Sequence, residues 1–312
     1  MNLLKKILEE SKKIDAQFEK TSEKELNSLE IILPVPKFHP RFFEIEKYKF
    51  AQLKLEDLES QDTFTLTKDK VIIIDESVSK QKFVDSFVKK YKINPIILKS
   101  VEDKVKTKKF LDNLLKEHKL NNLEDSVIIV IGGGLLINIG AYLAERTSAK
   151  LILFPTTVLS MADSAGGKVR VNYINETRAY KHFYKSFYEP NAMFLDERFL
   201  DLLPEKQIQI GLVEIIKHGL FQSPKLYDFL FKEGKNLFKD KQKLKKAILW
   251  ATSLKKVCLE IDVEENENGS RRILRGGHDF SDRIEEDERL RAYPQRQLPQ
   301  VINPQAKCNN AR

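Results

Sequence analysis

An apolar run that leads directly into three glycines constrains the fold of this chain more than any other feature. The run covers residues 127–131 and is followed by Gly132, Gly133 and Gly134. With the helical pattern of residues 136–145 behind it, it predicts a buried strand, a tight turn and a helix. Glycines allow close approach of a ligand, and a helix N-terminus presents free N–H groups, so the turn suits a phosphate. A plain strand-to-helix turn explains the same residues.

Short strands and helices alternate on both sides of this turn. We expect strands at residues 71–74, 95–98, 127–131 and 151–154, and helices at residues 81–91, 107–118 and 136–145. This alternation predicts an α/β fold in which helices cover a parallel sheet. Ligands bind such sheets outside the carboxyl ends of the strands, so we expect the functional site at that edge.

The pattern differs at both ends of the chain. Residues 29–64 contain short apolar runs interrupted by prolines, as in strands at the edge of a sheet. After residue 197, apolar residues recur at three- and four-residue spacing, which predicts a mostly α-helical domain. The expected domains are an N-terminal helix with edge strands (1–65), an α/β domain (66–196), a helical domain (197–282) and an irregular tail (283–312).

Length and composition limit the classes of function. The 312 residues are enough for two domains, and the net charge of +8 suits an anionic substrate. The lysines are spread along the chain without interleaved aromatics, so we expect no nucleic-acid partner. Two cysteines offer no disulfide framework, which indicates the cytoplasm. No apolar run approaches the roughly 20 residues that cross a bilayer, so we expect no membrane segment.

Polar residues follow the ends of two expected strands. Asp75 ends the first of them, where a carboxylate can accept hydrogen bonds from a ribose or cap the next turn. Thr156 and Thr157 follow a later strand, where their hydroxyls can bind a nicotinamide or ribose, or cap the helix that follows. Both interpretations stay open for each residue.

Charged pairs and one histidine are further candidates. Asp163 and Lys168 enclose two glycines that permit a sharp loop, which either aims the lysine at an anion or leaves it on the surface. Glu214 and Lys217 share one helix face among apolar neighbours, as an ion pair or as a metal ligand beside a cation. His278 follows two glycines and precedes an aspartate by four residues, which is acceptable Zn²⁺ ligand chemistry, although a lone histidine there is more often structural.

Together these motifs resemble the sugar-phosphate cyclases of the 3-dehydroquinate synthase family, over about residues 70–282. The resemblance implies a Rossmann-like NAD-binding α/β domain followed by a mostly α-helical metal-binding domain. In such enzymes bound NAD⁺ transiently oxidises a ring alcohol, and phosphate is eliminated. The ketone is then reduced, the ring opens, and an aldol step closes a carbocycle. The expected substrate is a phosphorylated sugar.

The resemblance also implies residue roles. It makes Glu214 and His278 ligands of a divalent metal, Zn²⁺ or Co²⁺, and Arg146 a phosphate contact across a homodimer. The residues that it places at the substrate are Asp163, Lys168, Lys217, Lys256 and Arg271. The residues that it places at NAD are Asp75, Gly132, Gly133, Gly134, Asn138, Thr156, Thr157 and Lys181.

Several departures from the family pattern bear on activity. Ile137-Asn138 replaces Gly-Asp, and Arg275 replaces an Asn. The loop over residues 169–183 is longer than usual, and the His-Gly-Glu segment with the third metal ligand is absent. Residues 1–270 contain 40 Lys and 5 Arg, whereas the remainder contains 1 Lys and 8 Arg. We therefore hypothesise a truncated or out-of-frame end after about residue 282.

Three alternatives to a 3-dehydroquinate synthase remain. The first is a sibling that uses another heptulose phosphate, such as a 2-epi-5-epi-valiolone or 2-deoxy-scyllo-inosose synthase. The second is a non-catalytic remnant that kept the NAD-binding fold and lost the metal site. The third is a metal-dependent alcohol dehydrogenase of the same general architecture.

Overall fold

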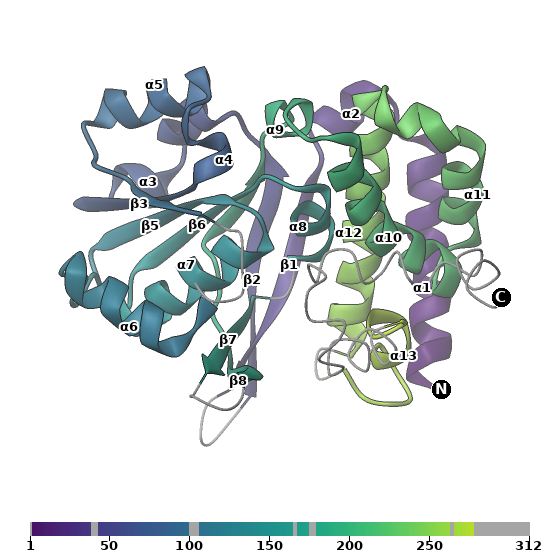
Figure 1. Ribbon diagram of the computed structural model, residues 1–312. Coiled ribbons are helices and arrows are strands. Elements are labelled where there is room, and N and C mark those ends of the chain that lie inside the picture. The colour runs from purple at the N-terminus through teal and green to yellow at the C-terminus, as the bar shows by residue number, and fades with distance from the viewer. Residues whose placement is uncertain are drawn as a thin grey trace, which may run out of the picture. The chain divides into compact units, whose positions relative to one another are not determined.

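The computed structural model describes residues 2–38, 43–99, 106–164, 167–174, 179–262 and 265–277. The side chains of residues 36–38, 43–46, 174 and 179–182 lie outside this description. The chain divides into two compact units (Figure 1). One unit is Glu23–Leu202, and the other joins Met1–Ser22 with Leu203–Arg312. We call them the sheet unit and the helical unit.

A seven-stranded sheet forms the core of the sheet unit (Figure 1). Its strands, in spatial order, are β1 (Glu30–Phe38), β2 (Phe43–Gln52), β9 (Ala192–Leu195), β6 (Lys150–Pro155), β5 (Ser126–Gly132), β3 (Asp69–Asp75) and β4 (Ile96–Leu98). Every neighbouring pair is parallel except the β1–β2 hairpin. All seven residues of β5 are buried, as its continuous apolar run requires in a sheet covered on both faces. The predicted α/β fold is confirmed.

Helices cover both faces of this sheet. The helices of the sheet unit are α2 (Glu23–Asn27), η1 (Leu55–Ser60), α3 (Asp62–Thr65), α4 (Glu76–Ser79), α5 (Lys82–Tyr91), α6 (Lys108–Glu117), α7 (Gly134–Thr147), α8 (Val158–Asp163) and α9 (Arg198–Asp201). Figure 1 shows α6 and α7 on one side of β3, β5 and β6, and α4 and α5 on the other. This arrangement is expected when all crossovers between parallel strands have the usual right-handed sense, because the chain runs from β3 outward to β4 and then back to β5.

A separate hairpin of β7 (Lys168–Ile174) and β8 (Ala179–Phe187) occupies the region that the sequence suggested was a long loop. The prediction of a loop over residues 169–183 is therefore wrong for the described part of this region. Val169 and Val171 are fully buried and alternate with Arg170, which is half-buried. This period of two is the pattern of a strand with one face covered.

The helical unit contains both ends of the chain's described part. Its elements are α1 (Leu3–Lys20), α10 (Glu205–Phe221), α11 (Pro224–Glu233), η3 (Gly234–Phe238), α12 (Lys241–Ile261) and α13 (Arg271–Leu274). Phe18 of α1 stacks on Trp250 of α12, with ring centroids 5.5 Å apart. Asp15 accepts hydrogen bonds from Ser223 Oγ at 2.5 Å and from Trp250 Nε1 at 2.9 Å. The predicted mostly helical domain is confirmed, and the boundaries at residues 65, 196 and 282 stay predictions.

The helices in the described part of the chain are too short or too polar to cross a membrane.

Candidate functional site

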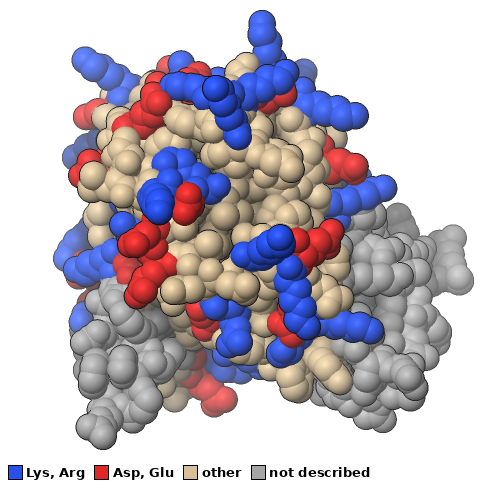
Figure 2. Space-filling view, turned by 90° about the vertical axis from the view of Figure 1, so that its left-hand side faces the viewer, with Lys and Arg blue, Asp and Glu red and all other residues tan. Residues whose placement is uncertain are grey.

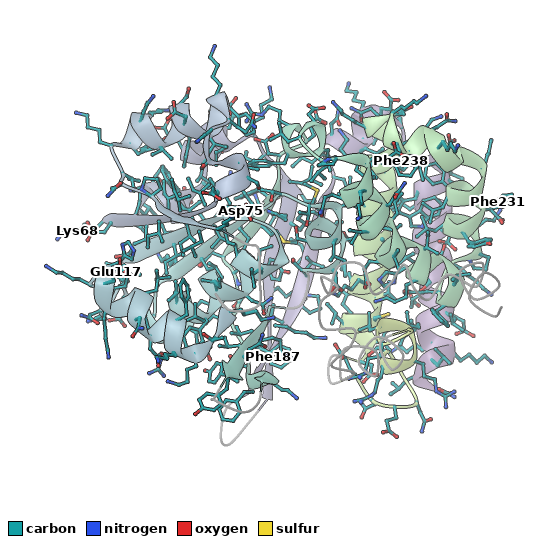
Figure 3. The ribbon with its side chains drawn as sticks, in the orientation of Figure 1. Lys68, Asp75, Glu117, Phe187, Phe231 and Phe238 are labelled. Atoms are coloured by element: carbon teal, nitrogen blue, oxygen red, sulfur yellow. The ribbon has the colours of Figure 1, made fainter. Side chains whose placement is uncertain are left out.

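Three neighbouring strands of the sheet unit end side by side. Ile74 of β3 pairs with Ile131 of β5, so Asp75 and Gly132 end adjacent strands. Gly132 pairs with the last residue of β6, and the N–H of Thr156 donates to the Gly132 carbonyl oxygen at 3.0 Å. Figure 3 labels Asp75 at this place. The structure thus brings Asp75, the glycine turn and Thr156 to one edge of the sheet.

This edge is also the point where the strand order reverses. From β3 the chain crosses to β4 on one side, whereas from β5 it crosses to β6 on the other. At such a reversal the two connections leave in opposite directions and open a crevice between the carboxyl ends. Asp75 and Gly132 flank that position, so the topology singles out the two residues that the sequence suggested.

The glycine turn leaves the start of α7 without a side-chain cap. Gly133 is the N-cap residue, and no side chain bonds the first N–H groups of this 14-residue helix. A Cβ on Gly134 would meet nothing within 4 Å, so the turn is open there, whereas a Cβ on Gly132 would lie 2.7 Å from Leu136 Cδ2. Uncapped N–H groups and the positive end of the helix dipole fit an anionic group such as a pyrophosphate.

Asp75 and Thr157 both cap local structure. Asp75 Oδ1 accepts from the N–H of Ser77 at 3.0 Å and from its hydroxyl at 2.6 Å. Thr157 and Ser160 form a capping box at the start of α8, in which Thr157 Oγ1 accepts from Ser160 N at 3.2 Å. Thr156 is 4% exposed. The capping interpretation therefore describes these side chains, and their contacts with a ligand stay a prediction.

The loop between Asp163 and Lys168 has the sharp turn that its glycines predict. Gly167 has a φ of +60°, and a Cβ on it would lie 2.8 Å from the Tyr188 carbonyl oxygen, so only glycine fits. Asp163 ends α8 and is exposed, while Lys168 begins β7 and is half-buried. Gly166 lies outside the described residues. Lys181 lies in β8, but its side chain falls outside the description.

Glu214 and Lys217 form a buried ion pair in the helical unit. They are 9% and 6% exposed, and Lys217 Nζ donates to the Glu214 carboxylate. The same ammonium donates to the Leu274 carbonyl oxygen at 2.9 Å, which joins α10 to α13. Removing the two charged groups from water costs free energy. The two hydrogen bonds of the Lys217 ammonium offset this cost, which allows the lysine to be buried.

The metal site that the sequence suggested is only partly within the described structure. Glu214 is described, whereas His278 lies outside the described residues. Within the residues that are described, no group of three His, Cys, Asp or Glu side chains is placed to hold a metal ion. Because a catalytic Zn²⁺ normally takes three protein ligands, the described residues alone do not complete such a site.

Lys255 is a candidate that the sequence reasoning missed. Lys256, the predicted substrate residue, has a 30% exposed side chain that pairs with Glu260 at 3.6 Å. Lys255 is only 3% exposed. Burial raises the pKa of the Cys258 thiol to about 12, and the positive charges of Lys217 and Lys255 act in the opposite direction. Lys255 lies three residues before Cys258, so the two residues share one face of α12.

The remaining predicted cations lie at exposed positions. Arg271 begins α13 and is exposed, and Arg146 is exposed in the last turn of α7. On the face shown in Figure 2, Lys and Arg side chains are spread among Asp and Glu, with no single basic stripe. This distribution agrees with the scattered lysines of the sequence.

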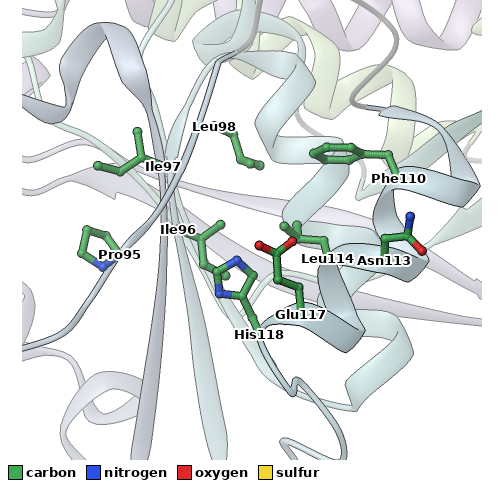
Figure 4. A pocket seen from close by; sticks show the side chains of 9 residues that line it. All are labelled: Pro95, Ile96, Ile97, Leu98, Phe110, Asn113, Leu114, Glu117 and His118. Atoms are coloured by element: carbon green, nitrogen blue, oxygen red, sulfur yellow. The ribbon is translucent and has the colours of Figure 1, made fainter.

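A pocket of about 400 Å³ lies between β4 and α6 (Figure 4). Its apolar lining includes Ile96, Phe110 and Leu114, with Glu117 and His118 at the end of α6. None of the predicted site residues lines it. Because the strand order and the glycine turn point to the carboxyl edge of the sheet, we do not assign the candidate site to this pocket.

Two family models match this chain. The model described as the 3-dehydroquinate synthase N-terminal domain matches residues 96–210, and that of the 3-dehydroquinate synthase C-terminal domain matches residues 211–294. Among curated proteins, the 3-dehydroquinate synthase of Pelagibacter ubique is 36% identical over 166 residues, covering 52% of this chain and 44% of the relative. That of Saccharolobus solfataricus is 37% identical over 162 residues, covering 51% and 44%. The chain aligns with less than half the length of these relatives.

Solved structures of cyclases share the fold. The 2-epi-5-epi-valiolone synthase of Streptomyces hygroscopicus, with NAD⁺ and Zn²⁺ bound, gives a TM-score of 0.69 at 19% identity and covers 84% of this chain and 74% of that one. A 2-deoxy-scyllo-inosose synthase, complexed with carbaglucose-6-phosphate, NAD⁺ and Co²⁺, gives 0.64 at 24% identity, with 82% and 72% covered.

Proposed function

Because this chain belongs to the 3-dehydroquinate synthase family, we propose that it is a sugar-phosphate cyclase that uses NAD and a divalent metal ion. Its reaction would eliminate phosphate from a heptulose phosphate and close a carbocycle by an intramolecular aldol step. The observation that carries this proposal is the meeting of Asp75, the glycine turn and Thr156 at the point where the strand order reverses. The cyclases of the same fold, solved with NAD⁺ and a metal ion, support it.

The sheet unit would hold the dinucleotide. The uncapped start of α7, with Gly132, Gly133 and Gly134, would bind the pyrophosphate, because its N–H groups have no side-chain partner. Asp75 would accept a ribose hydroxyl and Thr156 would face the nicotinamide end, as their places at adjacent strand ends suggest. When bound, NAD⁺ supplies a reversible hydride acceptor.

Cationic side chains would bind the anionic substrate. In the helical unit we assign this role to Lys217, Lys255 and Arg271, and in the sheet unit to Lys168. Lys217 is suited to it because the Glu214 carboxylate and a backbone carbonyl fix the direction of its ammonium. A buried ammonium attracts an anion more strongly than an exposed one does, since the effective dielectric constant is lower.

Both curated relatives named above are 3-dehydroquinate synthases, which favours that activity over the activities of its siblings. The metal ligands would be Glu214 and His278, and Asp163 would remain a substrate residue.

Assembly and location follow the family resemblance. We propose a homodimer in which Arg146 contacts the substrate phosphate of the partner subunit, and a cytoplasmic location. An exposed arginine at the end of α7 is accessible to a second subunit. The buried free thiol of Cys258 suits a reducing compartment.

Release of inorganic phosphate tests the activity. Purified chain would be incubated with NAD⁺, a divalent ion, and heptulose phosphates with and without a carboxylate, and phosphate would be measured over time. We expect release from the carboxylate-bearing substrate without net formation of NADH. No phosphate from any candidate would reject the cyclase proposal, and net NADH from a simple polyol would instead indicate an alcohol dehydrogenase.

Two matched lysine variants test the substrate assignment. We expect Lys255→Gln to lower kcat/KM by about 10- to 100-fold, because a hydrogen bond to a charged group is lost. Lys256→Gln, one residue away on a more exposed face, should stay within about twofold of the parent protein. Equal losses in the two variants would contradict the assignment of Lys255.

A further inference from the structure

Asn138 uses both ends of its side-chain amide within the sheet unit. It lies in α7, one turn after Gly134, and its Nδ2 donates to the Gly134 carbonyl oxygen at 2.9 Å. Its Oδ1 accepts a hydrogen bond from the backbone N–H of Arg170 at 2.8 Å. The amide therefore joins the first turns of the helix behind the glycine turn to a strand from another part of the chain.

The strand that Asn138 reaches is β7. On one side β7 pairs with β8, where Arg170 lies opposite Lys185. The N–H of Arg170 is directed to Asn138, so the amide takes the place of a neighbouring strand, as a part-buried backbone donor requires. The guanidinium of Arg170 donates to the carbonyl oxygens of Val169 at 2.8 Å and Ser186 at 2.9 Å. The hairpin backbone is therefore fixed where the amide meets it.

Lys168 depends on the position of this strand. It lies two residues before Arg170, about 7 Å along β7, and residues at this spacing share one face. Movement of β7 would change the distance between Lys168 and the glycine turn. A misplacement of about 1 Å in a reacting assembly can cost roughly 100-fold in rate.

We propose that Asn138 is a positioning residue, which holds β7 and thereby Lys168 at a fixed place relative to Gly132–Gly134 without contacting cofactor or substrate. The inference rests on the proposed function in so far as Lys168 binds the substrate. It replaces the direct NAD contact that the family resemblance implies for this residue.

A neutral amide suits this task better than a carboxylate does. An aspartate at position 138 would still accept from the Arg170 N–H, but it has no proton to donate to the Gly134 carbonyl oxygen. It would also add a negative charge near the helix N-terminus that is to hold a phosphate. The amide thus provides the bridge and leaves the anion site uncharged.

Hydrogen exchange of the Arg170 amide tests the bridge in the full-length chain without any ligand. Asn138→Ala removes both bonds and suits a helix interior, so the variant is expected to fold. We expect its Arg170 amide to exchange about 5- to 10-fold faster, the effect of one lost hydrogen bond. Asn138→Asp should keep most of the protection. Asn113→Ala, on the exposed side of α6, is the matched control and should leave exchange and turnover unchanged.

Kinetics and binding separate positioning from direct contact. With Asn138→Ala we expect kcat for phosphate release to fall about 10- to 100-fold, while the Kd for NAD⁺ stays within about threefold. Asn138→Asp should retain more of kcat than the alanine variant. Unchanged Arg170 exchange in Asn138→Ala, or a large rise in the Kd for NAD⁺ with unchanged kcat, would overturn the inference.

The two proposals fail in different ways. If the parent protein releases no phosphate, the cyclase proposal fails, and the exchange and NAD⁺ measurements still decide whether Asn138 bridges or binds. If the parent protein is active and Arg170 exchange does not respond to Asn138→Ala, the positioning role alone is rejected.

Discussion

Gly140 marks a place where α7 and β5 pack with no space for a side chain. A Cβ on Gly140 would lie 2.1 Å from Val130 Cγ2. Val130 is fully buried in β5, at the centre of the sheet unit. Gly140→Ala therefore introduces a methyl group into an occupied position, and we expect it to destabilise the sheet unit.

Two opposing effects set the magnitude. Alanine is more favourable than glycine inside a helix by about 1 kcal/mol. Overpacking a filled core costs about 1–3 kcal/mol. The methyl and Cγ2 would have to separate by about 2 Å to reach van der Waals distance, and the χ1 angle of a valine is stiff, so the upper part of this range applies. We expect a net loss of about 1–2 kcal/mol in the free energy of unfolding.

The assay has to report on the correct unit. The single tryptophan, Trp250, lies in the helical unit, so its fluorescence does not follow unfolding of the sheet unit. Hydrogen exchange of the β5 amides reports on the sheet unit, and urea unfolding monitored by circular dichroism adds the free energy of unfolding from the helices of both units.

A control in the same helix and a compensating change sharpen the test. Gly134→Ala, where a Cβ meets nothing within 4 Å, should leave the free energy of unfolding nearly unchanged. Adding Gly140→Ala to Val130→Ala should cost less than Gly140→Ala alone, because the clashing methyl is gone. A Gly140→Ala protein as stable as the parent, or more stable, would refute the packing argument, since helix propensity alone would then decide.

Three further predictions concern buried polar groups. Burial raises the pKa of Asp15 above its ordinary value of 3.8, by more than its hydrogen bonds lower it, so the ionised carboxylate destabilises the folded protein at higher pH. We expect Asp15→Asn to be more stable than the parent protein at pH 8, and the gain to vanish toward pH 4, in urea unfolding followed by Trp250 fluorescence. A gain that does not depend on pH would contradict this. Burial raises the pKa of the Cys258 thiol to about 12, so we expect iodoacetamide at pH 8 to alkylate Cys258 only after the chain unfolds. Peptide mapping of the labelled protein measures this. Rapid labelling of the native chain would show that the thiol is not buried. Arg198→Leu leaves the fully buried Asp196 side chain without its cation, so we expect the free energy of unfolding to fall by about 2–3 kcal/mol in urea unfolding followed by circular dichroism. This is less than for a fully buried pair, because the Arg198 side chain is 26% exposed. A loss below about 0.5 kcal/mol would show that the pair contributes little.

The elements of the sheet unit could be predicted because each carries a local signal. Residues 127–131, before Gly132, are all apolar and β-branched, so they predict a strand that is buried on both faces. The β7–β8 hairpin was missed although Val169 and Val171 carry its two-residue period. That signal is short, and the family pattern of a loop overrode it.

The place of α1 could not be predicted from periodicity. An amphipathic pattern shows which face is apolar, but not which distant helix covers it. An aspartate among lysines and glutamates is typical of a solvent-exposed helix face, but Asp15 is buried. Its burial is possible because Ser223 and Trp250, more than 200 positions away, donate hydrogen bonds to its carboxylate. Such a site becomes visible only when the helices are assembled.

The candidate site was predictable to the extent that it follows from topology. Asp75, Gly132 and Thr156 meet because the carboxyl ends of parallel strands lie at one edge. The burial of Lys255 beside the more exposed Lys256 was not predictable, because one residue in a helix turns the side chain by about 100°. The bond from Asn138 to Arg170 joins residues 32 positions apart, a pairing that no local pattern encodes.

The arrangement of α1 has a consequence for synthesis of the chain. This helix emerges from the ribosome before the sheet unit, whereas α10 and α12 emerge only after the 180 residues of Glu23–Leu202. At about 5–20 residues per second, that interval lasts roughly 10–40 s. During this interval Ile7 and Phe18 have none of their native neighbours from α10–α12. The sheet unit can fold in the meantime, before the rest of the helical unit has been translated. A helix translated before the sheet unit thus docks after it, and its apolar face is open to chaperones during that interval.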